Sequence, residues 1–377
     1  MAGRSSDDPK LPHDVVVEIL KRLPAESLLR FRCVSRSWRS TIDDPRFVAL
    51  HLNHSALDAS NRYLVCLEWR HRLCFLLPNE SLTLPFQSLI EIPFVNPSNC
   101  YGFVVSSNGL IWVAEILSNG CCQTMYLWNL FTRKHKVVRG SCPEHQFFSK
   151  ETAHVVLGFC FDVRSNDYKI VRIIYFPDDN RRYFGGSTLV EIYSLSTDSW
   201  RSLECEVPSF SGYRRAVFLN GNLHWFAFKF EDLLELGGYG AIVLFDVAGE
   251  VFDEMALPAE MLPEDDFGLI ASVEVLNDLL AVFISHGEQI GYLELHSNCS
   301  VWVMRHYGVP ESWTKMYTFE ASGLLRVCGG FTWTGELLIE IDSGKRVSWN
   351  PITGQFTNLP SWMTSDLVTV VESLVSL

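Results

Sequence analysis

The chain has 377 residues, which is too long for one ordinary domain, so we expect two or three domains. Apolar residues make up 47% and charged residues 20% of the sequence, a globular balance that excludes a disordered, collagen-like or coiled-coil chain. The formal net charge is −13: the first 50 residues carry +2 and the other 327 carry −15. An acidic body disfavours nucleic-acid binding and favours encounter with a basic protein partner. The alternative is that the charge only keeps the surface solvated.

Residues 1–10 are polar and charged and contain no apolar stretch typical of a secretory signal. We therefore expect a flexible N-terminus and a protein of the cytosol, the nucleus or both. The longest apolar stretch, residues 269–285, contains two acidic residues and is too short to cross a bilayer, so no membrane segment is predicted.

Eleven cysteines occur without a Cys-x-x-Cys spacing, and we expect reduced thiols that are mostly buried. His51 and His54 form a His-x-x-His pair but have no cysteine or carboxylate beside them in the sequence. We interpret both histidines as surface residues near a helix end. No metal site and no cofactor is predicted.

Residues 11–53 have helical periodicity. Val15, Ile19, Leu20 and Leu23 fall on one apolar stripe, so a first helix is predicted that Asp14 caps and that ends by residue 24. Further helices are predicted at residues 25–32, after residue 35 and after residue 44. About forty residues this rich in Leu, Val and Trp hold more apolar surface than three small helices bury, so part of it needs a partner. The alternative is that the stripe packs onto the rest of the chain.

The run LPHDVVVEILKRLPAESLLRFRCVSRSWRSTI closely resembles the F-box family. The resemblance implies a three-helix, all-α module over residues 11–54 that docks on the Skp adaptor of a Skp-cullin-F-box ubiquitin ligase. Through the adaptor, the module would reach the cullin and RING subunits. The positions that the resemblance implies as adaptor-facing or supporting are Leu11, Pro12, Val15, Ile19, Leu20, Leu23, Leu28, Leu29, Val34 and Trp38.

After residue 60, runs rich in Val, Ile, Tyr, Phe and Trp alternate with Gly, Asn, Asp and Ser turns, which predicts an all-β region. A sequence motif recurs in this region: a strand ends in an aromatic residue, and a polar turn then leads into a second strand. It is found around Trp128, Tyr193, Phe245, Trp302 and Trp349. These aromatic residues are 47 to 65 positions apart, close to the period of kelch-like propeller blades.

The repeat predicts a six-bladed β-propeller over residues 55–377. Five complete blades are predicted at residues 101–140, 153–205, 213–258, 269–320 and 322–362. A sixth, partial blade has strands at residues 63–69, 73–77 and 81–86 and lacks its innermost strand. Residues 367–374 form a β-rich segment that we expect to supply this strand and close the ring.

Several segments of this region resemble the plant F-box-associated domain: SSNGLIWV, LWNLFTRKHKVV, GFCFDVRSNDYKIVRI and VEIYSLSTDSW. Together the two resemblances imply a non-catalytic substrate receptor that recruits a target protein for ubiquitination and proteasomal degradation. The alternative is a scaffold that binds partners without promoting degradation. Neither a Gly-x-Ser-x-Gly elbow nor a Walker loop occurs, so we expect no enzyme. We interpret residues 162–168 and the tryptophans at 128, 200 and 349 as structural.

Successive strands of a blade run in opposite directions, so the loops after the second and fourth strands of each blade lie on one rim of the propeller. These loops are long at residues 177–187, 229–240 and 258–267, and long loops on a rigid scaffold commonly bind partners. The alternative is that they are only solvated loops. The predicted target-binding candidates are Asp178, Asp179, Arg181, Arg182, Tyr183, Glu231, Asp232, Glu235, Tyr239, Asp265 and Asp266.

Overall fold

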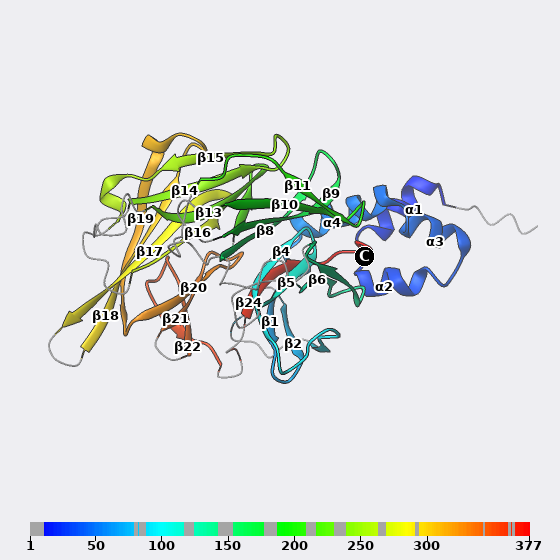
Figure 1. Ribbon diagram of the computed structural model, residues 1–377. Coiled ribbons are helices and arrows are strands. Elements are labelled where there is room, and N and C mark those ends of the chain that lie inside the picture. Colours follow the sequence, from blue (N-terminus) through cyan, green and yellow to red (C-terminus); the bar gives the residue numbers. More distant parts are fainter. Residues whose placement is uncertain are drawn as a thin grey trace, which may run out of the picture.

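The computed structural model places a helical module at one end of a ring of β-sheets (Figure 1). A short 3-10 turn connects the last α-helix to the first strand. The structure describes residues 11–78, 82, 88–116, 124–141, 154–176, 187–208, 216–229, 239–262, 269–290, 294–341, 344–360, 363 and 366–377.

The module has four helices within the described residues. Ser35 caps the third helix as predicted, since its Oγ accepts the Trp38 N–H at 3.1 Å, and Asp44 caps the fourth. The predicted cap at Asp14 is wrong: the cap position is Pro12, two residues earlier, so the helix begins at His13 and Asp14 lies in its first turn. The helices are α1 (His13–Leu20), α2 (Ala25–Phe31), α3 (Arg36–Ile42) and α4 (Pro45–Leu57), followed by the 3-10 turn η1 (Ala59–Asn61).

The described strands form six antiparallel sheets of four strands, which confirms the six blades. Blades 2 to 4 follow one another along the chain with the predicted bounds. Blade 2 holds β4 (Cys100–Ser107), β5 (Leu110–Ile116), β6 (Thr124–Asn129) and β7 (Lys134–Arg139). Blade 3 holds β8 (His154–Asp162), β9 (Asp167–Tyr175), β10 (Thr188–Ser194) and β11 (Ser199–Leu203). Blade 4 holds β12 (Val217–Leu219), β13 (Asn222–Lys229), β14 (Tyr239–Asp246) and β15 (Val251–Ala256).

Blades 5 and 6 continue the same order, with the 3-10 turns η2 (Ala259–Met261) before blade 5 and η3 (Pro310–Ser312) within it. Blade 5 holds β16 (Ile270–Leu276), β17 (Leu279–Ile290), β18 (Glu294–Met304) and β19 (Trp313–Ser322). Blade 6 holds β20 (Leu325–Phe331), β21 (Leu337–Ile341), β22 (Lys345–Trp349) and β23 (Phe356–Asn358). The first strand of each blade contacts that of a neighbouring blade, so first strands line the centre.

Blade 1 combines the two ends of the propeller sequence. Its order is β24 (Asp366–Val371), β1 (Arg62–Glu68), β2 (Leu73–Pro78) and β3 (Ser88–Glu91). β24 pairs with β1 in antiparallel register from Arg62↔Val371, and it contacts β4 of blade 2 on the inner side. The outer strand β3 lies further along the chain than the predicted residues 81–86, of which the structure describes only Leu82.

Apolar clusters fill the interfaces between neighbouring blades. Trp112 of blade 2 stacks on Phe159 of blade 3 with ring centroids 5.9 Å apart, and the buried Trp225 of blade 4 donates its indole N–H to the Leu157 carbonyl of blade 3. A further cluster joins Cys66 and Leu77 of blade 1 to residues of blade 6. Buried contacts therefore link each blade to the next, including the last to the first.

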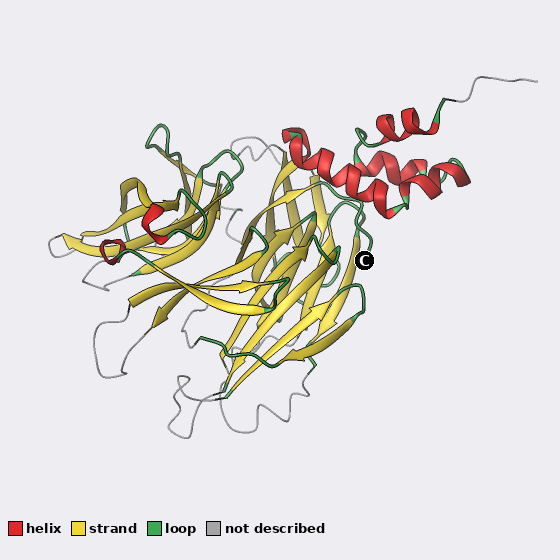
Figure 2. Cartoon of the chain, turned by 90° about the horizontal axis from the view of Figure 1, so that it is seen from above, coloured by secondary structure: helices red, strands yellow, loops and turns green. Residues whose placement is uncertain are grey.

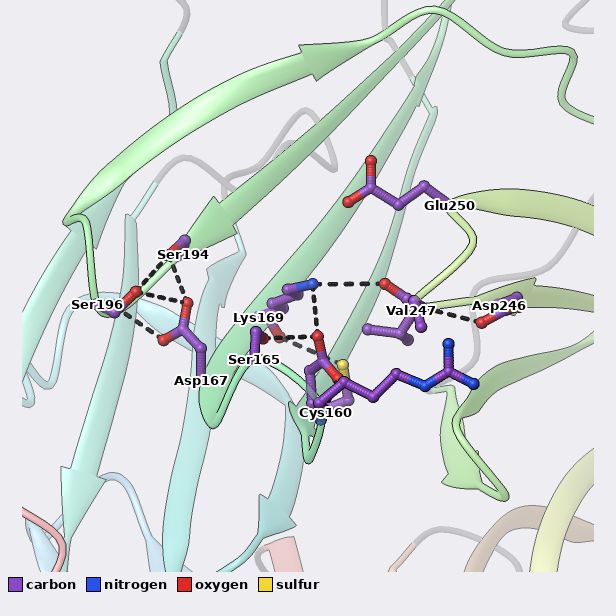
Figure 3. Close-up of polar contacts among 12 residues, drawn as sticks. Cys160, Ser165, Asp167, Lys169, Ser194, Ser196, Asp246, Val247 and Glu250 are labelled. Carbon is purple, nitrogen blue, oxygen red and sulfur yellow. Dashed lines mark hydrogen bonds and ion pairs between the residues drawn. The ribbon is translucent and has the colours of Figure 1, made fainter. Parts of the chain in front are cut away.

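A polar turn between β8 and β9 ties blade 3 to blade 4 (Figure 3). The Asp162 carboxylate accepts hydrogen bonds from the Arg164 N–H, the Ser165 hydroxyl and the Lys169 ammonium, at 2.9, 2.6 and 2.8 Å. Lys169 also reaches the Val247 carbonyl of blade 4 at 3.4 Å. The prediction that residues 162–168 form a structural turn and strand start is confirmed.

The described cysteines are free thiols. Five of them are buried in the sheets: Cys66, Cys74, Cys160, Cys299 and Cys328. Burial raises the pKa of the Cys160 thiol to about 12, which keeps this thiol protonated and unreactive.

Candidate functional site: an exposed apolar face on a fixed helical module

The C-terminal residues form part of the core of the helical module. Leu374, which follows the last strand, packs in one buried cluster with Leu20, Leu28, Ile42 and Phe47 from the four helices. The helices therefore share a core with the end of the propeller sequence and are not held by the chain connection alone. Figure 2 shows the helices gathered at one end of the sheets.

Glu372 connects the propeller to α2 through a buried hydrogen bond. Its side chain is 4% exposed, and Oε1 accepts the Ala25 N–H at 2.7 Å. Its own backbone N–H donates to the Asn61 carbonyl at 2.9 Å, just before β1. Burial raises the pKa of Glu372, and the nearby Glu26 carboxylate raises it further, whereas the Ala25 N–H lowers it.

Blade 2 holds the same C-terminal segment from the other side. The fully buried Asn129 donates from Nδ2 to the Ser373 and Val375 carbonyls, at 3.2 and 2.8 Å. Gly109 comes so close that a Cβ there would overlap the Ser373 side chain. The C-terminal segment from residue 372 onward is thus clamped between the helices and blade 2.

This contact between the C-terminal segment, the helices and blade 2 was not predicted from the sequence. Asn129 does lie in one of the recurring aromatic motifs, and Glu372 and Leu374 lie in the β-rich segment predicted at residues 367–374. The predicted strand therefore ends three residues too late, because β24 stops at Val371 and the residues after it turn to the helical module.

The interpretation of His51 as a surface residue is wrong. His51 is 1% exposed, and its Nε2 lies 3.0 Å from the Leu23 carbonyl. Burial lowers the pKa of His51 below its ordinary value of 6.5, which favours a neutral ring. His51 is buried because the side of α4 that carries it packs against the segment joining α1 to α2. His54 is half-buried.

Several apolar residues of the module remain exposed. Leu11, Val15 and Ile19 are 61%, 42% and 48% exposed. Val15 and Ile19 lie one turn apart on the same side of α1, and Leu11 lies just before the helix; we call these three residues the α1 stripe. Pro12 is exposed beside them, and Val34, between α2 and α3, is 66% exposed. Large exposed apolar side chains gathered on one helix are typical of an interaction surface.

The other predicted adaptor positions lie inside the module. Leu20 and Leu28 are fully buried in its core, whereas Leu23, Leu29 and Trp38 are half-buried. Trp38 packs edge-on against Phe31, with ring centroids 5.1 Å apart. The structure therefore gives Leu20 and Leu28 a supporting place and leaves the α1 stripe free for contact.

The two rims of the propeller differ in their relation to the helices. The turns after the first and third strands lie on the rim that carries the module, since Gly109 and Asn129 contact the C-terminal segment there. Antiparallel pairing then places the connections after the second and fourth strands on the opposite rim, which we call the far rim.

Most of the predicted target-binding residues lie outside the described residues. The backbone of Tyr239 is described, at the start of β14, but its side chain is not. The remaining candidates outside the described part of the chain are Asp178, Asp179, Arg181, Arg182, Tyr183, Glu231, Asp232, Glu235, Asp265 and Asp266.

Two other kinds of site are absent from the described residues. No group of three or more His, Cys, Asp or Glu side chains there is arranged to hold a metal ion. None of the described helices has both the length and the apolar character that crossing a membrane requires.

Comparison with known proteins identifies both parts of the chain. Residues 9–50 match the model of the F-box domain, and residues 104–348 match that of the F-box associated beta propeller domain. The F-box protein CPR1 of Arabidopsis thaliana is 29% identical over 325 residues, covering 82% of this chain and 73% of that protein. The Arabidopsis thaliana F-box protein At3g07870 is 27% identical over 404 residues, covering 93% of this chain and 89% of that protein.

Among solved structures, that of YjhT has a TM-score of 0.44 and 14% identity and covers 80% of this chain and 95% of that one. The two domain matches follow each other in the order of the helical module and the propeller, and the Arabidopsis relatives span nearly the same length. The chain therefore belongs to the plant F-box proteins that carry a C-terminal F-box-associated β-propeller domain.

Proposed function

We propose that this protein is the non-catalytic substrate-recognition subunit of a Skp-cullin-F-box ubiquitin ligase. In this proposal, the α1 stripe binds the Skp adaptor, and the adaptor joins the protein to the cullin and RING subunits. The propeller recruits a target protein, which is then ubiquitinated and degraded by the proteasome. The proposed site of action is the cytosol or the nucleus.

The observation that carries the proposal is the exposed α1 stripe on a module whose inner core is already complete. Leu20, Leu28 and Leu374 complete the inner core, so the exposure of Leu11, Val15 and Ile19 is not explained by a missing contact within the described chain. Removing such a side chain from water contributes about 1.5 to 3 kcal/mol, so three of them support a firm interface after the cost of association.

The joint between the module and the propeller supports a positioning function. The buried Glu372 and Leu374 fix the helices on one rim, while the far rim points away from them. A target held on a rigid receptor has a high effective concentration beside the ligase, and this speeds transfer without any new catalytic group.

Adaptor docking is tested by co-purification of the full chain with a plant Skp adaptor. The variant Val15→Asp plus Ile19→Asp places two charges in the stripe, and we expect it to lose the adaptor while its thermal unfolding is unchanged. Substitution of Leu20 is unsuitable, because Leu20 is 2% exposed and a charge there would unfold the module. The matched control is Ile352→Asp, since Ile352 is an apolar residue of blade 6 that is 87% exposed.

Equal adaptor recovery with the stripe variant and the control would contradict the proposal. The degradative step has a separate readout in plant cells. If the protein is a ligase receptor, proteins captured by the propeller accumulate when the stripe variant replaces the wild type. If their levels stay constant, the protein acts as a non-degradative scaffold.

A further inference from the structure

The β17–β18 hairpin of blade 5 extends past the rest of its sheet at the far rim. β17 has 12 residues and β18 has 11, whereas the inner strand β16 has 7. Pairing between β16 and β17 stops at Ile270↔Ser285, and from His286 to Ile290 β17 pairs with β18 alone among the described strands. Figure 1 shows the hairpin reaching away from the helices. Residues 287–290 therefore form an open inner edge, which we call the β17 edge.

Backbone hydrogen-bonding groups point out of the β17 edge. Leu276 and Leu279 flank a two-residue turn with positive φ at both positions, so these two residues exchange hydrogen bonds. Every second residue of β17 from Leu279 onward then faces the inner side. By this alternation, Gly287 and Gln289 turn their N–H and C=O groups inward, where no described residue pairs with them. These donors and acceptors have the spacing of a β-ladder and can pair with a further strand.

The hairpin is fixed at its base by blade 6. Ser297 of β18 lies opposite Gly287 and is 1% exposed. Its Oγ donates to the Gly323 carbonyl at 3.0 Å and accepts the Leu325 N–H, at the start of β20, at 2.8 Å. A strand that adds to this edge therefore meets a receptor that is already ordered, which lowers the cost of binding.

A pocket of about 610 Å³ lies beside the same edge. Its wall includes the face of blade 5 that packs on blade 4: His286 of β17 pairs with Asn298 of β18, which pairs with Glu320 of β19, and all three line the pocket. The turn η2 adds Glu260 and Met261. Side chains alternate between the two faces of a strand, so every second residue of an added strand shares the face of His286. Such residues lie next to the pocket.

The charges of the pocket favour a basic side chain. Glu260 and Glu320 are exposed carboxylates. The ammonium of Lys315 lies over the Trp302 ring, 4.8 Å from its centre, so this cation is engaged with an aromatic face. Residues 51–377 carry a net charge of −15, which attracts a basic segment over a longer range.

A second copy of this chain is a poor match for the β17 edge. Its four residues span about 13 Å, since each residue of a strand rises about 3.3 Å, and so short a contact buries far less than the roughly 1,200 Å² of a stable interface. Two acidic propellers also repel each other. An extended peptide needs only the ladder and the pocket.

We propose that an extended, basic segment of the target protein adds to β17 as a further strand. Its backbone exchanges hydrogen bonds with Gly287 and Gln289. A lysine or arginine side chain of the segment lies in the pocket beside Glu260 and Glu320. Strand addition takes its affinity from main-chain hydrogen bonds and its specificity from alternate side chains. The identification of the segment with a target rests on the proposed function, whereas strand addition to β17 does not.

Strand addition is tested with peptides on the full chain bound to the Skp adaptor. The probes are acetyl-Val-Lys-Val-Lys-Val-Lys-amide, the same peptide N-methylated at its central residues, and the same peptide with glutamate in place of lysine. Saturation-transfer NMR measures their affinities. We expect the first peptide to bind and the other two to bind about tenfold more weakly, because N-methylation removes the ladder donors and glutamate reverses the charge.

A proline variant locates the bound peptide. Gln289→Pro removes an inward N–H and spares the β17–β18 ladder, whose hydrogen bonds come from the residues on either side. We expect it to lower the affinity for the lysine peptide about tenfold. The matched control is Val137→Pro in the outer strand β7: the same alternation points its N–H away from the sheet, and the residue is 44% exposed. Thermal unfolding and adaptor binding check that both variants are folded.

The pocket is tested separately by reversing its charge. We expect the double variant Glu260→Lys plus Glu320→Lys to prefer the glutamate peptide to the lysine peptide. An unchanged preference would overturn the assignment of the basic side chain to this pocket.

Strand addition itself is wrong if the plain and N-methylated peptides bind equally, or if Gln289→Pro and Val137→Pro bind the lysine peptide equally. If the wild type forms a dimer in analytical ultracentrifugation that Gln289→Pro dissociates, the edge binds a second copy and the assignment to a target is wrong. A chain that fails to bind the adaptor but keeps peptide binding contradicts the proposed function and leaves strand addition intact.

Discussion

Asp162 shows how one carboxylate stabilises the contact between two blades. Burial opposes its ionisation, but hydrogen bonds from Lys169, Ser165 and the Arg164 N–H outweigh this and lower the pKa of Asp162 to about 2. The ionised form is therefore favoured in the folded state. Its contribution to stability is complete above the ordinary pKa of 3.8 and is lost as the pH falls from there toward 2.

We expect Asp162→Asn to lower the free energy of unfolding by about 1.5 to 3 kcal/mol at pH 7, the range for hydrogen bonds to charged groups. The variant should also lose part of the dependence of stability on pH between about 4 and 2. Urea unfolding at several pH values measures both effects. The control is Asp253→Asn, an exposed carboxylate of β15, and an equal effect of the two substitutions would disprove the role of the turn.

Sequence patterns predicted single residues unevenly. The caps at Ser35 and Asp44 and the turn after Asp162 follow from local hydrogen bonding, which the neighbouring residues decide. The burial of His51 was not predictable in this way, because its partner, the Leu23 carbonyl, is 28 positions away.

The C-terminal segment is the element that joins the two domains. Glu372 accepts from the first N–H of α2, and its buried carboxyl has a raised pKa. For an acid with a raised pKa, stability is complete below the ordinary value of 4.5, where the group is protonated in both states. Stability is then lost as the pH rises through the folded-state value, since ionisation leaves a charge in the joint.

Two substitutions of Glu372 separate its charge from its hydrogen bond. Glu372→Gln keeps an oxygen acceptor for the Ala25 N–H without the charge, so we expect unchanged or higher stability at pH 7 to 8 and a flatter pH profile. Glu372→Ala leaves this N–H without its acceptor, and we expect a loss of about 1 to 3 kcal/mol. Chemical unfolding between pH 4 and 8 makes the comparison, and equal losses for both variants would contradict the account.

The elements themselves were largely predictable. The 3.6-residue periodicity of the module and the recurring aromatic motifs both reflect local packing. The helices and the bounds of blades 2 to 6 therefore agree with the predictions. The β-rich C-terminal segment was predicted in blade 1, and β24 lies there beside β1. The outer strand β3 and the docking of Leu374 on the helices depend on tertiary contacts and were not predicted.

The arrangement of the two rims links the fold to the proposed function. Strand parity already indicated that the long loops share one rim, but the sequence did not indicate where the helical module sits. The contacts of Gly109, Asn129 and Glu372 place the module on the other rim. An adaptor on the α1 stripe and a target on the far rim would then bind at opposite ends of one rigid body.

Hydrogen–deuterium exchange of the full chain, with and without saturating Skp adaptor, locates the adaptor on the protein. We predict slower exchange over residues 11–23 in the complex, with no change at the far-rim ends of β9 and β13. Slower exchange at those far-rim ends without protection of α1 would contradict the account, because it would place the adaptor where the target is proposed to bind.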